Sequence, residues 1–394
     1  MRAVELFVGA GGLGMGVSQA GFETVAVIER DNYCCDTIRE NQRRQLEPIV
    51  KWPLTQGDVR HFDFSAIAEQ VDFVSGGPPC QPFSLGGRHQ GWDDARDMFP
   101  EAVRAVRELR PRAFLFENVK GLTRTTFSTY FEYIRLQMMY PDLAAVKDES
   151  WAHHLARLEK HHTHGRQTGL SYRVVTRVLN AANYGVPQRR ERVLFVGFRD
   201  DIDIEWCFPA ETHSRDSLVW DQARGDYWDR HHVARSERKL SPHVEARAKR
   251  LSSRPKELPW RTVRDALKGM PDPEHEPLLS SKYINHRFQP GARIYKGHTG
   301  SPLDEPAKTL KAGVHGVPGG ENMLCRPDGS VRYFTVRECA RLQTFPDEFL
   351  FHGSWTETMR QLGNAVPVSL AQLVATDIRR YLEKTHDQRP HIIR

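Results

Sequence analysis

The 394-residue sequence lacks several features that would assign it to a special class of protein. No apolar run approaches the ~18 residues that a membrane-spanning helix needs. The six cysteines form no CxxC pair and no regular framework, which argues against a disulfide scaffold and favours a reduced cytosol. Residues 1–7 enter a strand pattern directly, without signal-peptide anatomy, and no internal repeat is present. We therefore expect a cytoplasmic, globular protein.

The excess of positive charge is small and concentrated in one stretch. The formal net charge is +6, and residues 211–330 carry 21 Lys and Arg against 16 Asp and Glu, so +5 of the +6 falls there. A basic surface favours a polyanionic partner, because binding releases condensed counterions. A modest positive charge also aids solubility, so composition alone does not decide for nucleic acid.

The first 120 residues alternate between apolar strand patterns and helical patterns. This alternation predicts an α/β fold with a mostly parallel sheet that is covered by helices on both faces. A chain of 394 residues is too long for one ordinary core and suits two domains. The expected strands are residues 3–8, 24–28, 72–75, 113–116, 172–176 and 192–196, with helices over 98–109 and 369–383.

Two stretches interrupt this pattern. Residues 121–168 include five closely spaced histidines without regular metal-ligand spacing, and we interpret them as a partly helical surface insertion. Residues 205–333 accumulate Pro, Gly, His and Arg, which predicts a smaller, loop-rich second domain. The first domain is then expected over 1–204, with 334–394 returning the chain to complete it.

Residues 9–14 read Gly-Ala-Gly-Gly-Leu-Gly between an expected strand and an expected helix, which satisfies G-x-G-x-x-G. Glu29 ends the next strand, where such folds hold ribose hydroxyls. Asp58 follows a third strand and suits either an adenine amine or a turn or N-cap. The turn alone fits an NAD-dependent oxidoreductase, another adenosine cofactor or, less well, a purely structural turn.

The segment Ser-Gly-Gly-Pro-Pro-Cys-Gln-Pro-Phe-Ser (75–84) follows a strand directly. Its three prolines fix the backbone around Cys80, as a nucleophile that must meet one atom requires. Glu117 ends another expected strand, where parallel sheets gather active-site residues. Gln-Arg-Arg-Glu-Arg (188–192) opens a later strand, and by itself would be interpreted as a solvated face.

Together these segments form an ordered series of motifs. The series is Phe-x-Gly-x-Gly-Gly (7–12), Gly-Pro-Pro-Cys-Gln-Pro (77–82), Glu-Asn-Val (117–119), Gln-x-Arg-x-Arg (188–192), Arg-Glu-x-Ala-Arg-Leu-Gln-x-Phe-Pro (337–346) and Gln-x-Gly-Asn-Ala-Val-Pro (361–367). It resembles the bacterial C5-cytosine DNA methyltransferases over residues 1–120, 171–200 and 335–385. The sequence departs from that family at Glu5, where Asp is usual, and at Met98, where Leu is frequent.

The resemblance implies a Rossmann-like S-adenosylmethionine-dependent methyltransferase fold, with 205–333 as the target-recognition domain. Cys80 would attack carbon 6 of cytosine as a thiolate, so that carbon 5 can accept the methyl group. Glu117 would bind N3 and the exocyclic amine, and Arg192 the O2 edge. Arg190 would contact the nucleophile loop or the DNA backbone.

The resemblance also implies the cofactor, S-adenosyl-L-methionine, and the residues around it. Four residues of the first motif would surround the methionine portion, while the others would contact ribose, adenine and the remaining faces. The four residues around the methionine portion would be Phe7, Gly9, Gly11 and Gly12. Glu29 would contact the ribose and Asp58 the adenine amine, while Pro78 would lie under the cofactor and Asn364 would reach it from the far end of the chain.

The implied substrate is double-stranded DNA, whose target cytosine must be flipped out of the helix. Residues 82–97 would close over that base. Five exposed-type cations of the basic region would contact phosphates: Lys239, Arg247, Lys249, Arg250 and Arg254.

We expect a monomeric modification enzyme of a restriction-modification system, paired in function with a restriction endonuclease, without metal or membrane. Two alternatives within the same fold remain. One is the same chemistry on tRNA, which the long basic region argues against. The other is a catalytically silent DNA-binding regulator, which the presence of Cys80, Glu117 and Arg192 argues against.

Overall fold

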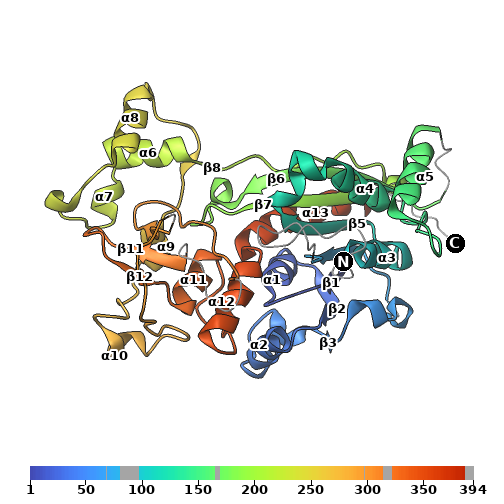
Figure 1. Ribbon diagram of the computed structural model, residues 1–394, viewed down its shortest axis with the longest axis horizontal. Coiled ribbons are helices and arrows are strands. Elements are labelled where there is room, and N and C mark those ends of the chain that lie inside the picture. Colours follow the sequence, from blue (N-terminus) through green and yellow to red (C-terminus); the bar gives the residue numbers. More distant parts are fainter. Residues whose placement is uncertain (68, 80–96, 165–168, 297, 314–321, 387–394) are drawn as a thin grey trace. The chain divides into compact units, whose positions relative to one another are not determined.

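The computed structural model describes residues 1–67, 69–79, 97–164, 169–296, 298–313 and 322–386 (Figure 1). The chain divides into two compact units. The first comprises Met1–Val178, Arg192–Pro209 and Ala371–Arg394, and the second comprises Leu179–Glu191 and Ala210–Leu370. In these described ranges, no helix is both long enough and apolar enough to cross a membrane.

A seven-stranded sheet forms the centre of the first unit. Its strands are β1 (Arg2–Leu6), β2 (Glu23–Glu29), β3 (Leu54–Gln56), β4 (Phe73–Gly76), β5 (Ala113–Val119), β6 (Tyr172–Asn180) and β7 (Glu191–Arg199). The order is β3-β2-β1-β4-β5-β7-β6, with β1 to β5 parallel and β7 antiparallel to β5. This confirms the predicted mostly parallel sheet. The order reverses beside β1 and β4, where open α/β sheets bind ligands.

Side chains alternate between the two faces of this sheet. On one face, Val4 and Phe114 join a buried core with α3 (Phe99–Leu109) and α4 (Ser128–Met139). The opposite face carries Glu5, and α1 (Gly12–Gln19) packs there, since a Cβ at Gly14 would lie 3.3 Å from Glu5 Cγ. Helices therefore cover both faces, as the buried parallel strands require.

Helix α13 (Val368–His386) closes the first unit, as the apolar spacing at 369–383 predicts. Arg379 donates to the Ala20 carbonyl at the end of α1 (3.0 Å), and the Leu382 carbonyl accepts a hydrogen bond from Arg112 (2.7 Å). The terminal helix is thus docked on the first βα unit and on the start of β5. Helix α2 (Asn32–Arg43) follows β2.

The stretch expected as a surface insertion is helical, but it is not all surface. Tyr130 of α4 and Leu158 of α5 (Trp151–His164) are buried in the main core. His154 is buried between the Tyr133 hydroxyl (2.9 Å from Nδ1) and the Leu143 carbonyl (2.6 Å from Nε2). The insertion interpretation is therefore wrong for α4, whose apolar side chains the sheet needs as cover.

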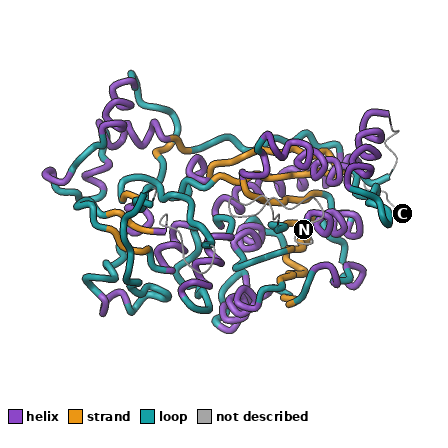
Figure 2. Tube along the Cα trace, in the orientation of Figure 1, coloured by secondary structure: helices purple, strands orange, loops and turns teal. Residues whose placement is uncertain are grey.

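The second unit consists of short elements joined by long loops (Figure 2). Its small cores surround Leu218 and Tyr227 in one place and Val219 and Val244 in another. The second unit is thus rich in loops, and its role as a target-recognition domain stays a prediction. The elements are β8 (His213–Ser214), α6 (Arg215–Arg224), α7 (Tyr227–Arg230), α8 (Pro242–Arg250), β9 (Leu258–Pro259), α9 (Val263–Leu267), α10 (Pro277–Ser280), β10 (Ser301–Pro302), β11 (Met323–Cys325), β12 (Val331–Tyr333), α11 (Val336–Leu342) and α12 (Trp355–Asn364).

Two segments that the sequence pattern placed with the first domain lie in the second unit, namely 179–191 and 334–370. The Gln188 side chain donates to the Leu342 carbonyl (3.3 Å) and accepts from the Leu310 N–H (3.0 Å). These buried bonds tie both segments to the loop-rich part. The functional boundaries at 204/205 and 333/334 remain a proposal.

Candidate active site

A tight glycine turn follows β1. Phe7 (φ 53°), Gly9 (φ 57°) and Gly11 (φ 93°) adopt left-handed backbone conformations, which glycine tolerates and phenylalanine adopts under strain. A Cβ at Gly11 would lie 3.0 Å from the Trp52 indole, whereas one at Gly9 would find no atom within 4 Å. Trp52 therefore closes one side of the turn, and the Gly9 side is open to a ligand.

Glu29 ends β2 and organises the backbone beside this turn. Its Oε2 accepts the Gly9 N–H (2.8 Å), and its Oε1 accepts the N–H groups of Arg30 (2.8 Å) and Asp31 (2.7 Å). Parallel pairing of β1 with β2 brings these groups together. The structure thus places Glu29 next to the glycine turn, with its carboxylate held by three donors.

Asp58 follows β3 and caps a short turn by accepting the Arg60 N–H (3.0 Å). The Arg60 side chain (2.6 Å) and Arg30 (3.2 Å) also bind its carboxylate. The hydrogen bonds from Arg60, with a smaller contribution from Arg30, hold the pKa of Asp58 well below its usual range. Asp58 therefore caps a turn, as one of its two interpretations predicts. An adenine amine that bound the same carboxylate would share it with two arginines.

The segment after β4 is held in place by contacts with β1 and β5. A Cβ at Gly76 would lie 2.6 Å from the Leu6 carbonyl oxygen, so only glycine fits where β4 ends against β1. Asn118 of β5 donates to the Pro78 carbonyl (2.9 Å), and the Met98 N–H donates to the Pro79 carbonyl (3.0 Å). Pro78 is buried at this position. Cys80 itself lies outside the described residues.

Glu117 and Arg192 form a buried ion pair, with Arg192 Nε 2.6 Å from Glu117 Oε1. In the antiparallel pair of β5 and β7, Arg192 lies opposite Val119, so Glu117 is its diagonal neighbour on the same face. Burial lowers the pKa of the Arg192 guanidinium, and the Glu117 carboxylate opposes this effect. A Cβ at Gly77 would lie 3.3 Å from Glu117 Oε2, so the pair lies directly beside the segment that leads to Cys80.

The other two predicted site residues, Arg190 and Asn364, lie in the second unit. Arg190 is fully buried and donates to the carbonyls of Leu310 (3.0 Å) and Gly363 (2.7 Å). A buried guanidinium that is bonded to two backbone carbonyls favours a structural role over a contact with a DNA phosphate, and the role of Arg190 in the site stays a prediction. Asn364 is exposed at the end of α12.

Comparison with known proteins assigns these features to one family. The family model for C-5 cytosine-specific DNA methylase matches residues 1–139 and 158–380. The chain belongs to the C-5 cytosine-specific DNA methylase family. It is 32% identical over 388 residues to the type II methyltransferase M.Eco47II of Escherichia coli, covering 97% of this chain and 79% of that protein. It is 29% identical to M.NgoMIV of Neisseria gonorrhoeae, covering 97% and 98%.

Among solved structures, the Dnmt2 methyltransferase of S. pombe shares the fold, with a TM-score of 0.55 and 18% identity over 98% of this chain and 99% of that one. These matches confirm the resemblance inferred from the motifs and the methyltransferase fold class. The chain is therefore an enzyme, a DNA (cytosine-5) methyltransferase. Between residues 1 and 380, the family model leaves only 140–157 unmatched, which is a shorter stretch than the expected insertion.

Methyltransferases of this family generally use S-adenosylmethionine, and the first unit fits that cofactor. The open side at Gly9 leaves room for it, and α1 begins at Gly12 without a side-chain cap, so its first N–H groups suit a carboxylate. The Glu29 carboxylate is anchored beside the same turn. The methionine portion and the ribose could therefore be held by groups that the fold already fixes.

Sequence reasoning gave no functional weight to two residues that support this site. Trp52, 4% exposed, packs over Gly11 and donates to Ser18 Oγ (3.1 Å). Glu5, 2% exposed, accepts a hydrogen bond from Ser75 on the adjacent strand. Burial raises the pKa of Glu5 to about 8, although the Ser75 hydroxyl opposes this rise. An acidic residue inside the apolar run 3–8 was the available signal for Glu5.

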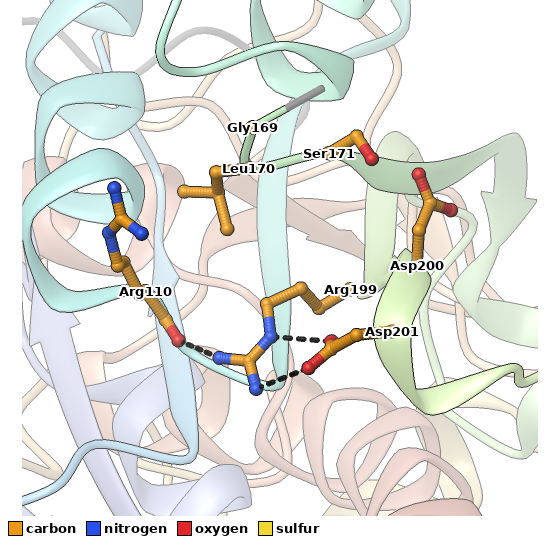
Figure 3. Close-up of a pocket in the computed structure, with 7 residues that line it drawn as sticks. All are labelled: Arg110, Gly169, Leu170, Ser171, Arg199, Asp200 and Asp201. Carbon is orange, nitrogen blue, oxygen red and sulfur yellow. Dashed lines mark hydrogen bonds and ion pairs between the residues drawn. The ribbon is translucent and has the colours of Figure 1, made fainter. Parts of the chain in front are cut away.

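A pocket of about 270 Å³ in the first unit lies elsewhere (Figure 3). Arg110 and Arg199 line it at the amino end of β5, whereas Glu117 lies near the carboxyl end. Arg199 is already bound to Asp201 (2.7 Å) and to the Arg110 carbonyl. This pocket does not belong to the candidate site. Within the described residues, no group of three or more His, Cys, Asp or Glu could hold a metal ion.

Proposed function

We propose that this protein methylates carbon 5 of a specific cytosine in double-stranded DNA, using S-adenosyl-L-methionine, a covalent Cys80 adduct and base flipping. The observation that carries the proposal is the buried Glu117–Arg192 pair beside Gly77. A carboxyl group and a guanidinium on one face suit the N3–amine edge and the O2 of one cytosine. A structural ion pair in a sheet would not require a reactive group close by, whereas Cys80 follows soon after Gly77, which lies beside Glu117.

Cytosine needs activation because its carbon 5 is a weak nucleophile. The Cys80 thiolate forms a bond to carbon 6, and the ring electrons become those of an enamine that can attack a methyl group. The cofactor, when bound, supplies that methyl group on a sulfonium. Loss of the carbon 5 proton then returns the electrons to the ring, the bond from carbon 6 to Cys80 breaks, and 5-methylcytosine is released.

Glu117 and Arg192 act on the charge that develops in this ring. Glu117 binds the exocyclic amine and holds a proton at N3, while Arg192 donates to O2. Both groups are buried and share one face, so they present a fixed arrangement to the base. Such preorganised groups stabilise the transition state more than flexible surface groups do, because no reorganisation is needed during the reaction.

The remaining parts of the proposal concern the biological setting. The similar proteins M.Eco47II and M.NgoMIV are named type II methyltransferases, which supports a role as the modification enzyme of a restriction-modification system. Double-stranded DNA is the substrate that the family name indicates. A target base inside a duplex must leave the stack to reach the site, at a cost of a few kcal/mol.

One experiment tests both the reaction and its substrate. A plasmid propagated with the gene is bisulfite-sequenced, and protected cytosines in one recurring sequence are the expected result. A duplex carrying 5-fluorocytosine at that position should then trap a covalent complex with the purified protein in the presence of cofactor. Plasmid DNA without protected cytosines, with methylation found on tRNA instead, would overturn the DNA substrate.

A further inference from the structure

Glu5 is a buried titratable residue that the proposed reaction leaves without a role. Its side chain is 2% exposed, and it lies on β1 between the parallel strands β2 and β4, with Ser75 of β4 directly opposite. The Ser75 hydroxyl donates to Oε2 of Glu5. Within the described residues, Oε1 is buried and has no hydrogen-bond partner. A charge on this carboxyl would be poorly compensated, which favours the form that carries its proton.

The described elements packed around Glu5 bring no charged side chain to it. Neither α1 nor β4 contains a titratable residue, and the acidic residues of β2, Glu23 and Glu29, lie at its two ends. A Cβ at Gly14 would lie 3.3 Å from Glu5 and 3.1 Å from Trp52, so the space around the carboxyl is filled. Burial therefore raises the pKa of Glu5 to about 8, and a hydrogen bond opposes this rise.

The hydrogen bond between Glu5 and Ser75 joins the two strands that lead into the candidate active site. Gly9 of the glycine turn follows Glu5 by four positions, and Cys80 follows Ser75 by five. Beyond this pair, β1 and β4 share one more matched pair of residues before both strands end. The separation of the strands at this level therefore determines where the two segments begin.

We propose that Glu5 is a positioning residue for methyl transfer, whose neutral carboxyl, bound to Ser75, holds the glycine turn and the segment leading to Cys80 at a fixed separation. The inference rests on the proposed function. Loss of the proton would place a charge in a filled space, which the strands could relieve only by moving apart or by admitting water. A displacement of about 1 Å can slow a reaction by about 10²-fold. Both side chains are buried, so cofactor affinity should change little.

The first test compares the full-length wild type with Glu5→Gln. Glutamine has the size of glutamate, can accept the same hydrogen bond and stays neutral at every pH. Single-turnover methyl transfer is measured at saturating target DNA and S-adenosyl-L-methionine from pH 6.5 to pH 9.5. The rates are compared as a ratio, because ionisation of Cys80 affects both proteins alike. At pH 7 the two rates should agree within about twofold. At pH 9, about one unit above the pKa of Glu5, the wild type should be about tenfold slower than the variant.

The second test removes the hydrogen-bond donor and keeps the carboxyl. Ser75→Ala should slow single-turnover transfer at pH 7 by about tenfold, while the Kd of S-adenosyl-L-methionine, measured by calorimetry, stays within about twofold of wild type. Ser65→Ala is the matched control, because the exposed Ser65 donates to the Asp63 carboxylate (2.6 Å). Glu23→Gln, at an exposed position, is the control for Glu5→Gln. Both controls should behave like wild type at every pH.

Two results would overturn the inference and leave the proposed function intact. One is a constant ratio of the wild-type and Glu5→Gln rates up to pH 9, with circular dichroism showing both proteins folded. The other is a Ser75→Ala variant that binds the cofactor more weakly but keeps its rate at saturation, because the pair would then serve cofactor binding. A wild type that transfers no methyl group to DNA at any pH would overturn the proposed function and the inference together.

Discussion

Two sets of charged residues, one in each unit, are held in opposite ways. In the first unit, Glu117 and Arg192 are buried, paired and fixed by the register of β5 and β7. In the second, Lys239, Lys249, Arg250 and Arg254 are exposed, and within the described residues they form no ion pair. The buried charges suit chemistry on one base, because the strand register and their ion pair fix their positions. The exposed charges suit recognition, because they can adapt to a long polyanion.

This contrast separates rate from affinity. Changes at the strand ends of the first unit should reduce methyl transfer and leave DNA binding unchanged. Neutralising the exposed cations of the second unit should do the reverse. Single substitutions in each unit therefore test this separation.

Replacing the nucleophile should affect only chemistry. Cys80→Ala should reduce methyl transfer by roughly 10⁴-fold or more, since no other group can form the bond to carbon 6. Binding of a target duplex should remain within about twofold of wild type. Tritium transfer from labelled cofactor measures the first quantity, and fluorescence anisotropy the second.

Cys207 provides the matched control, because it is an exposed, free cysteine in the same unit. Cys207→Ala should leave both measurements unchanged. Retention of the 5-fluorocytosine adduct by Cys80→Ala would contradict the covalent mechanism. Loss of the 5-fluorocytosine adduct in Cys207→Ala would show that Cys207, and not Cys80, is the nucleophile.

Glu117→Gln should slow methyl transfer by about 10²- to 10⁴-fold, because a neutral amide cannot hold the proton at N3. Cofactor affinity, measured by calorimetry, should stay as in wild type. Glu29→Gln should give the opposite pattern, with weaker cofactor binding, since its carboxylate lies beside Gly9. Loss of cofactor binding in Glu117→Gln would reassign Glu117 to the cofactor.

The sequence predicted these strands well because each is an apolar run that a parallel sheet buries on both faces. It also selected Glu117 and Arg192, but not their ion pair, which depends on the antiparallel register of β5 and β7. Arg190 and Arg192 look equivalent in Gln-x-Arg-x-Arg. What separates them is that the carbonyl partners of Arg190 come from Leu310 and Gly363, which no local pattern can reveal. Trp52 was missed for the same reason, because its contacts with Gly11 and Ser18 join residues that are far apart in the sequence.

The buried carboxyl of Glu5 predicts a pH dependence of stability. Its pKa is about 8 in the folded protein against 4.5 ordinarily, so the folded state binds the proton more tightly. The group therefore stabilises the fold at low pH, and this contribution is lost as pH rises from about 4.5 to about 8. Each tenfold change in proton affinity is worth about 1.4 kcal/mol, so ionisation in the folded state costs on the order of 5 kcal/mol.

Glu5→Gln removes that loss. The free energy of unfolding of the variant, relative to that of wild type, should therefore increase from pH 5.5 to pH 8.5. Urea unfolding at these two pH values measures it. Glu23→Gln, at an exposed position on β2, should show no such gain. Equal pH dependence in wild type and Glu5→Gln would mean that Glu5 is ionised throughout this range.

Arg190→Gln tests whether the contrast between the units holds inside the second unit itself. The guanidinium is fully buried, and its loss leaves the carbonyls of Leu310 and Gly363 without their donor, at a cost of about 2–3 kcal/mol in unfolding free energy. No phosphate contact is lost, so the salt slope of DNA binding should not change. Arg189 is the control next to it in sequence. Its guanidinium is partly exposed and lies 3.5 Å from the Glu305 carboxylate. Such a surface ion pair stabilises little, so Arg189→Gln should lower the free energy of unfolding by less than about 1 kcal/mol. A normal stability with a reduced salt slope in Arg190→Gln would place that arginine on DNA after all, and buried charge in this unit would then serve recognition too.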